Sequence, residues 1–155
     1  MGLKYQNIMV AIDGSKEADW AFKKGIEIAK RNNAKMLLVH VIDTRSFAII
    51  EAYDSVVGDR AEKLATEMLE NYLQHALDAG VTDVQYEIDF GSPKIRIARE
   101  LAKNHEIDLI LCGATGLNTV ERFFMGSVSE HIVRYAPCDV LVIRKEKELV
   151  DDDTE

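Results

Sequence analysis

The sequence DLILCGATGLNTVERFFMGSVSEHIV, residues 108–133, joins a short apolar run to an amphipathic segment through a long loop that contains glycines. Its apolar run LILC predicts a fully buried strand, and the spacing of apolar residues after Ser127 predicts a helix. Gly113 and Gly116 therefore follow a strand, while Gly126 stands where a helix begins. A strand and a helix joined in this way are typical of a parallel sheet covered by helices.

The loop also has the residue types that bind phosphate groups. Backbone N–H groups are free where a helix begins, and a glycine lets the main chain approach an anion without a Cβ in the way. Ser127 would add a hydroxyl at the positive end of the helix dipole. Gly113 alone could simply turn the chain after its strand. The complete spacing from Gly113 to Ser127 favours a nucleotide phosphate.

Strands and helices alternate along the rest of the chain. Apolar runs predict strands at about residues 5–12, 34–42, 84–90, 109–112 and 140–143. Helical spacing predicts a helix capped by Ser15, a helix at 59–79 that stops at Gly80, a helix capped by Ser92 and begun by Pro93, and a helix at 127–135. Residues 43–57 are expected to form a loop or a short helix. This alternation predicts an α/β fold with a doubly wound, five-stranded parallel sheet and helices on both faces.

The first two helices are predicted from the spacing of their apolar residues. The inward stripe of the first helix is predicted to be Ala18, Ala21, Phe22, Gly25, Ile26 and Ala29. In the second helix, the apolar residues that repeat at helical spacing are Leu64, Ala65, Met68, Leu69, Tyr72, Leu73, Ala76 and Leu77.

Right-handed crossovers between five parallel strands leave few possible topologies, and the order 3-2-1-4-5 is the common doubly wound solution. This order places the first and fourth strands side by side at the point where the winding direction reverses. The loops after these two strands then open a crevice. Asp13 and Gly113 are expected to face that crevice, and the end of the second strand near Val41 is expected to line it.

Composition predicts one compact domain followed by a charged tail. The chain has 155 residues, of which 47% are hydrophobic, and only 2 prolines, so residues 1–145 can build a single core. Residues 145–155 carry two lysines against six acidic residues, which is half of the net charge of -8. Without helical periodicity or apolar anchors, residues 146–155 are expected to be an acidic, disordered tail.

The sequence also argues against several classes of protein. It begins without a secretion signal and has no stretch of roughly 18 apolar residues, so we expect a cytoplasmic protein with no membrane span. No basic stripe with interleaved aromatic residues is present, which argues against nucleic acid as a partner. Cys112 and Cys138 stand at predicted strand ends and are interpreted as small core residues, and no metal site is expected.

Several motifs together resemble the universal stress protein family. The spacing G-x-x-G-x(9)-G-S from Gly113 to Ser127 matches the nucleotide-binding signature of that family. The segment IMVAIDGS at residues 8–15 resembles its first strand and Asp-containing turn. The motifs Gly91-Ser92-Pro93, Asp108-Leu109-Ile110, Ala136-Pro137-Cys138 and Val140-Leu141-Val142-Ile143 are similar to its later elements. Asp139 departs from the family, which commonly has proline there. The resemblance covers about residues 5–144.

This resemblance implies a site for ATP, with Mg²⁺ held mainly by the phosphates. It assigns phosphate binding to Gly116, Gly126, Ser127 and Ser129, ribose contacts to Asp13 and Gly113, and adenine recognition to the main chain near Val41. Further residues placed in the same predicted site are Ala11, Ile12, Cys112, Thr115 and Val128.

Some of these assignments have structural alternatives. Asp13 could instead form a turn ahead of Ser15, and Ser129 could bond only to the backbone of its own helical turn. Thr115 could offer a hydroxyl to phosphate or be an ordinary loop residue. Because no Lys follows the glycines as in G-x-x-x-x-G-K-[ST], the sequence predicts at most slow ATP hydrolysis. Of the four histidines only His131 is predicted near the crevice, and a role as a base is not favoured.

Two other functions remain open. A receiver-type phosphoacceptor, interpreted as sharing the same winding, would use Asp89 with help from Asp13 and Lys145. It is weakened because Asp13 is a single acid and Gly113 stands where a receiver has a hydroxyl. The other alternative is a scaffold dimer without nucleotide, and the intact glycine signature argues against it.

The fifth strand, residues 140–143, predicts a homodimer. In the order 3-2-1-4-5 this strand lies at a sheet edge, yet it is apolar on both faces and carries no charge or proline to discourage pairing. The family resemblance implies the same arrangement. The alternative is that the helices and the tail cover the edge.

Overall fold

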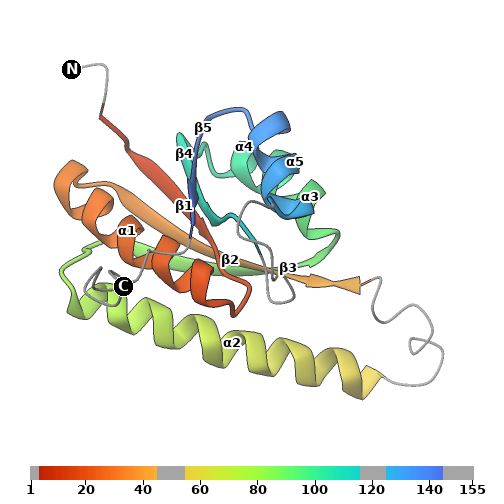
Figure 1. The fold of residues 1–155 in the computed structure, drawn as a ribbon. Helices are drawn as coiled ribbons and strands as arrows, with labels where there is room; N and C mark the ends of the chain where they lie inside the picture. Colours follow the sequence, from red (N-terminus) through yellow and green to blue (C-terminus); the bar gives the residue numbers. More distant parts are fainter. Residues whose placement is uncertain (1–3, 45–54, 116–124, 145–155) are drawn as a thin grey trace, which may run out of the picture.

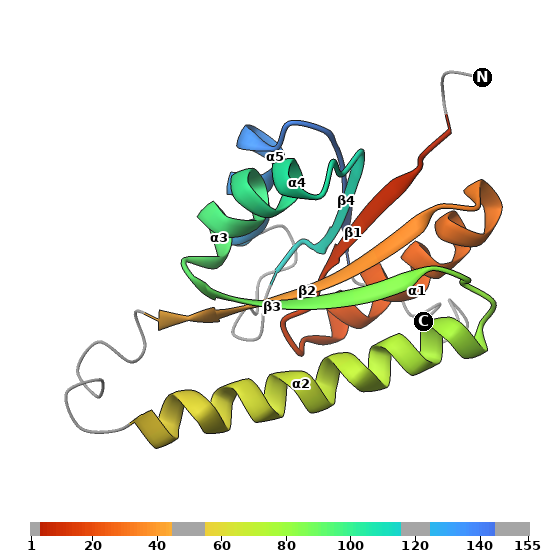
Figure 2. The same ribbon diagram turned by 180° about the vertical axis from the view of Figure 1, so that it is seen from behind.

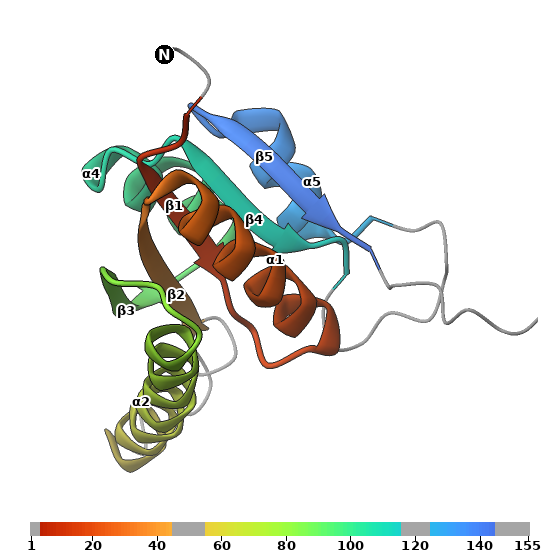
Figure 3. The ribbon, with the colours of Figure 1, turned by 90° about the vertical axis from the view of Figure 1, so that its left-hand side faces the viewer.

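The computed structural model describes residues 4–44, 55–115 and 125–144. All five of its strands are parallel and form one sheet in the order β3-β2-β1-β4-β5 (Figure 3). The strands are β1 (Asn7–Ala11), β2 (Lys35–Asp43), β3 (Val84–Gly91), β4 (Leu109–Gly113) and β5 (Asp139–Ile143). The predicted fold class and strand order are confirmed, and the strand bounds differ from the prediction by one or two residues at some ends.

Helices cover both faces of this sheet (Figures 1 and 2). The helices α1 (Lys16–Asn32) and α2 (Ser55–Asp78) lie on one face, and α5 (Ser127–Tyr135) lies on the other together with the segment after β3. Successive strand residues point to opposite faces. In β1, Ile8 and Val10 therefore join the core beneath α1 and α2, while Met9 joins the core beneath α5.

The first two helices follow the predicted pattern with three exceptions. The Ser15 hydroxyl caps α1 by accepting from the Ala18 N–H at 3.1 Å, as predicted. Ile28 is buried in the inward stripe, whereas Ile26 is only half-buried. On α2, Leu64 and Leu77 share the helical spacing but are 58% and 42% exposed.

The exposure of these two leucines has a simple geometric origin. Over residues 58–78 of α2, the buried residues are Ala65, Leu69 and Ala76. Each residue of an α-helix is rotated about 100° from its neighbour, so Leu64 and Leu77 lie to the side of this line. The helix starts at Ser55, earlier than predicted, and Gly80 follows its end with φ of +105°. Most of the connection 43–57, namely residues 45–54, and the acidic tail 146–155 lie outside the described residues.

The third helix has a π-helical segment between two short α-helical segments, which the spacing of apolar residues did not indicate. Pro93 begins it, as predicted, in α3 (Pro93–Ile95), which continues as a π-helical segment η2 (Arg96–Leu101) and then α4 (Ala102–Asn104). Ser92 is the N-cap residue, as predicted, but its hydroxyl makes no capping bond. Its oxygen is buried and finds no partner among the described residues. The Ser92 carbonyl instead accepts from the Arg96 N–H at 3.0 Å.

Candidate functional site

The candidate site lies where the adjacent strands β1 and β4 end. Val10 pairs with Leu111 in the parallel register, so the turn at Asp13 and the loop at Gly113 leave the same edge of the sheet. Burial and the nearby Asp13 carboxylate raise the pKa of the Cys112 thiol to about 12. The electrostatic effect of Asp13 on a β4 side chain agrees with the predicted proximity of these two strand ends.

Gly113 is required by the close packing of α1. A Cβ built on Gly113 would lie 2.8 Å from the Glu17 Cβ and 3.2 Å from the Glu17 carbonyl carbon. Contacts this short would force backbone to move, because the nearest atoms are not the ends of flexible side chains. The packing of α1 against β4 is therefore one physical reason for the first glycine of the loop, beside the approach of an anion that the sequence indicated.

The carboxylate of Glu17 reaches across to the loop. Its Oε2 accepts from the Thr115 backbone N–H at 2.6 Å and from the Thr115 hydroxyl at 2.5 Å. The hydroxyl that we considered for phosphate binding is therefore bonded within the protein. Sequence reasoning missed Glu17, because an acidic residue in the first turn of a helix is already explained by the helix dipole.

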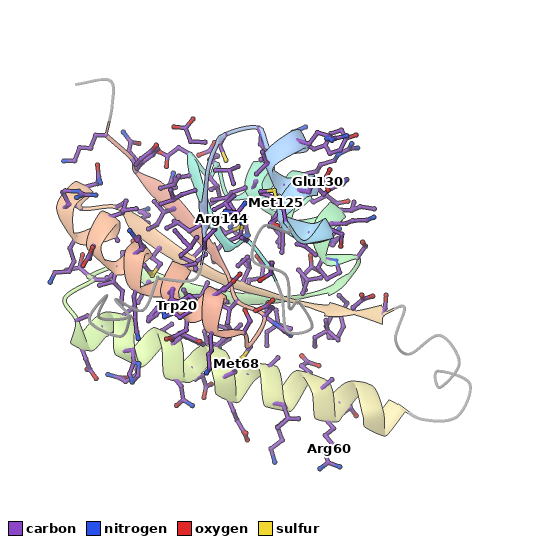
Figure 4. The ribbon with its side chains drawn as sticks, viewed as in Figure 1. Trp20, Arg60, Met68, Met125, Glu130 and Arg144 are labelled. Carbon is purple, nitrogen blue, oxygen red and sulfur yellow. The ribbon has the colours of Figure 1, made fainter. Side chains whose placement is uncertain are left out.

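The two described ends of the glycine loop are tied together at Ala114. The Ala114 carbonyl accepts from the Gly126 N–H at 2.7 Å, and the Ser129 hydroxyl lies 2.7 Å from the same oxygen. The Ser129 side chain is 3% exposed and also lies 3.0 Å from the Gly126 carbonyl. The contacts described for the Ser129 hydroxyl are therefore with backbone carbonyl groups. Met125, which precedes Gly126, marks this end of the loop in Figure 4.

The helix α5 begins at this junction without a side-chain cap. Gly126 is its N-cap residue and has φ of −65°, and no side chain in the part of the chain that the structure describes caps the first N–H groups. Ser127 is exposed at the first position of the helix. A helix start with uncapped N–H groups is a favourable place for an anion. The predicted Gly116 lies outside the described residues.

The turn after β1 is held by short polar contacts. The Asp13 carboxylate is exposed and accepts from the Ser15 N–H at 2.9 Å, so Asp13 does form a turn ahead of the helix cap. His40 Nδ1 lies 2.7 Å from the Ile12 carbonyl, so this half-buried strand histidine has a backbone partner. The strand β2 pairs with β1 as far as Val39 and continues to Asp43. Val41 therefore lies just beyond the end of β1.

Other predicted site residues have side chains that belong to the core. Ile12, Val41 and Cys112 are buried, while Ala11 and Val128 are half-buried and pack against the core beneath α5. A ligand could therefore contact Ile12, Val41 and Cys112 mainly through their main chain. This agrees with a predicted role for Val41 that used backbone groups alone.

His131 lies close to an aromatic ring and to several cationic side chains. Its ring packs on Tyr135 with the centroids 4.5 Å apart, and its buried Nε2 has no partner among the described residues. Burial lowers the pKa of His131, and the nearby cations of Lys94, Arg99 and Arg134 lower it further. The imidazole is therefore neutral near pH 7 and is surrounded by cations of α3, η2 and α5.

The receiver interpretation was wrong about the sheet. A receiver has the strand order 2-1-3-4-5, which puts its third strand beside the first. Here β3 is an edge strand, and β2 separates it from β1. Asp89 is also occupied, because its carboxylate accepts from Arg96 Nε at 2.5 Å. Lys145 lies outside the described residues.

The part of the chain that the structure describes gives little support for a metal site or a reactive thiol. No group of three or more His, Cys, Asp or Glu side chains in those ranges could hold a metal ion. Both cysteines are free, and burial is the main factor that raises the pKa of Cys138 to about 11. Thiols with such high pKa values are poor nucleophiles near neutral pH. No helix in the described ranges is long and apolar enough to cross a bilayer.

Comparison with known proteins identifies the family. The model of the Universal stress protein family matches residues 4–144. The chain belongs to the universal stress protein family. A universal stress protein of Staphylococcus haemolyticus (strain JCSC1435) is 50% identical over 145 residues, covering 94% of this chain and 88% of the relative.

Solved structures of universal stress proteins share the fold. Universal stress protein UspA from Lactobacillus plantarum is 34% identical with a TM-score of 0.84, and the match covers 92% of this chain and 100% of that one. A universal stress protein in complex with cAMP is 28% identical with a TM-score of 0.66, covering 91% of this chain and 98% of that one. An adenine nucleotide thus binds at least one protein with this fold.

Proposed function

We propose that this universal stress protein binds ATP at the ends of β1 and β4, and that it acts in the cytoplasm through nucleotide-dependent conformation or partner binding. The observation that carries the proposal is the junction at Ala114, which joins the two ends of the glycine loop beside the uncapped start of α5. Free N–H groups and the positive end of a helix dipole are the features that a phosphate requires. The cAMP complex of a relative supports an adenine nucleotide as the ligand.

The proposed roles follow the position of each group. The phosphates would bind at Gly116, Gly126 and Ser127, with Mg²⁺ held mainly by the phosphates. Ser129 would join them only if its hydroxyl left the Ala114 carbonyl. The exposed Asp13 carboxylate, beside Gly113, would accept from ribose hydroxyls. The main chain near Val41 would read the purine edge.

The direct test is whether the purified protein carries or binds adenine nucleotide. Acid release followed by chromatography identifies any nucleotide that co-purifies, and calorimetry with ATP measures the affinity of the stripped protein. We expect ATP to bind with the higher affinity and GTP to bind more weakly, because the purine edge is read by backbone groups. Absence of binding by a folded, stripped protein at millimolar ATP would refute the proposal.

We predict that any ATP hydrolysis is far slower than the median enzyme turnover of about 10 per second. The physical reason is that no lysine follows the glycines of the loop to clamp the phosphates. Release of phosphate from ATP under saturating conditions measures the rate. The His131→Ala variant is expected to leave that rate unchanged. A turnover comparable to ordinary enzymes that this variant abolishes would show that His131 is catalytic.

A further inference from the structure

The Glu17 side chain bonds directly to the described start of the glycine loop. Its carboxylate takes both donors of Thr115, the backbone N–H at 2.6 Å and the hydroxyl at 2.5 Å. Its backbone lies against Gly113, where a Cβ would meet the Glu17 carbonyl carbon at 3.2 Å. Glu17 is therefore fixed at the loop by its main chain as well as by its side chain.

These two bonds are of the kind that a phosphate oxygen makes. A phosphate in a loop of this type accepts from backbone N–H groups and hydroxyls, and a carboxylate oxygen is the protein group that imitates it most closely. The first turn of α1 favours a negative charge at Glu17 through the helix dipole. Within the described ranges, no Lys or Arg forms an ion pair with Glu17 to neutralise that charge.

The position of Thr115 makes the carboxylate a competitor of the ligand. Thr115 directly follows Ala114, whose carbonyl joins the two ends of the loop. A phosphate bound between these ends meets the Glu17 charge at short range, in a half-buried place where charges are screened less than in water. The exposed Asp13 carboxylate, on the turn before α1, adds a second negative charge on the same side.

We propose that Glu17 is a specificity-determining residue, an internal anion that occupies the phosphate donors of Thr115 and lowers the affinity of the site for nucleotide phosphates. The inference rests on the proposed function and adds a regulatory consequence to it. Because the ligand must displace the carboxylate, the site fills only at high nucleotide concentration. The loss of affinity caused by Glu17 increases with the negative charge that the ligand brings to the loop. It is therefore largest for ATP, smaller for AMP and absent for adenosine.

The test compares Glu17→Gln with the wild-type protein by calorimetry against ATP, AMP and adenosine. Glutamine keeps the size and an acceptor oxygen for Thr115 but removes the charge. We expect Glu17→Gln to bind ATP at least fivefold more tightly and AMP with a smaller gain, while the affinity for adenosine changes less than twofold. The gain for ATP should shrink as salt is raised, because salt screens charge. Glu27→Gln is the matched control, since Glu27 is exposed on the same helix and away from the loop, and it should change nothing.

A second measurement follows the contact itself without a ligand. In Glu17→Ala the Thr115 N–H loses its partner, and its hydrogen exchange should become at least tenfold faster while the exchange of the β1 and β4 core amides stays the same. Unchanged exchange at Thr115 would mean that the contact does not form in solution, and would overturn the inference.

The remaining outcomes separate this inference from the proposed function. If the wild-type protein binds ATP and Glu17→Gln binds it equally or more weakly, the inference fails and the ATP site stands. If Glu17→Gln binds ATP more weakly than the wild-type protein only when Mg²⁺ is present, Glu17 is a metal ligand and the inference is also overturned. If Glu17→Gln gains as much affinity for adenosine as for ATP, the role of Glu17 is purely structural. If no nucleotide binds the wild-type protein or the variant, the proposed function fails and this inference fails with it.

Discussion

Replacing Gly126 by valine is expected to lower the affinity for ATP at least tenfold, which corresponds to about 1.4 kcal/mol. The backbone of Gly126 has φ of −65°, so a side chain is allowed there by conformation. A Cβ would nevertheless lie 3.3 Å from the Ala114 carbonyl oxygen and 3.5 Å from the Thr115 Cα. The two further methyl groups of valine would crowd the junction of the loop and cover the first N–H groups of α5. Calorimetry with ATP measures the effect.

The same substitution at Gly58 is the control. A Cβ at Gly58 on α2 would meet no atom within 4 Å, so Gly58→Val should leave ATP affinity unchanged. Thermal unfolding of both variants separates a binding defect from a folding defect. If Gly126→Val is well folded and binds ATP as tightly as the wild-type protein, the glycine loop is not part of the binding site.

Local patterns in the sequence were sufficient for most of the fold. Apolar runs located the strands because the central strands of a parallel sheet are buried on both faces and even its edge strands keep apolar residues against the helices. Ser15 and Pro93 located helix starts because their side chains act on the backbone within one turn. Right-handed crossovers leave few topologies, and the strand order followed from choosing the common doubly wound order among them. The strand and helix signals act between residues that are close in the sequence, and the handedness of crossovers is common to parallel sheets.

The features that were missed depend on contacts between distant parts of the chain. Glu17 and Thr115 are 98 positions apart, and nothing near either residue indicates the bond between them. Gly113 was explained by an approaching anion, whereas the structure also shows α1 packed against it. Leu64 satisfied the helical spacing but lies outside the contact with the sheet. Sequence spacing shows which residues can share a face, and only the packed structure decides how wide that face is.

The strand β5 has the properties of a pairing edge. Within the described residues it pairs with β4 on one side and with no strand on the other. Val140 and Val142 are half-buried against the core beneath α5, while Leu141 is 36% exposed on the opposite face. Beside Leu141 is an open groove of about 440 Å³ between α1 and β5, which Trp20 and Arg144 help to line (Figure 4).

We expect the wild-type protein to be a homodimer in which β5 pairs with its copy about a two-fold axis. Such pairing would satisfy the outward N–H and C=O groups of the edge and bury Leu141 against the partner. The alternative, in which the tail from Lys145 covers the edge, concerns residues outside those described. Light scattering after size exclusion at micromolar protein measures the oligomeric state, and a protein that stays monomeric at high concentration would refute the dimer.

A lysine at position 141 should dissociate this dimer. Two Leu141→Lys chains would bring like charges together across the axis, next to the cations Lys23, Lys24 and Arg144 that already line the groove. We expect the dimer dissociation constant to rise at least a hundredfold, about 2.8 kcal/mol at 1.4 kcal/mol per tenfold. Leu64→Lys is the matched control, because Leu64 is 58% exposed on α2 and away from the sheet edge. Since Leu141 is already partly exposed, the monomer should remain folded. A Leu141→Lys protein that stays dimeric would show that any dimer contact lies elsewhere.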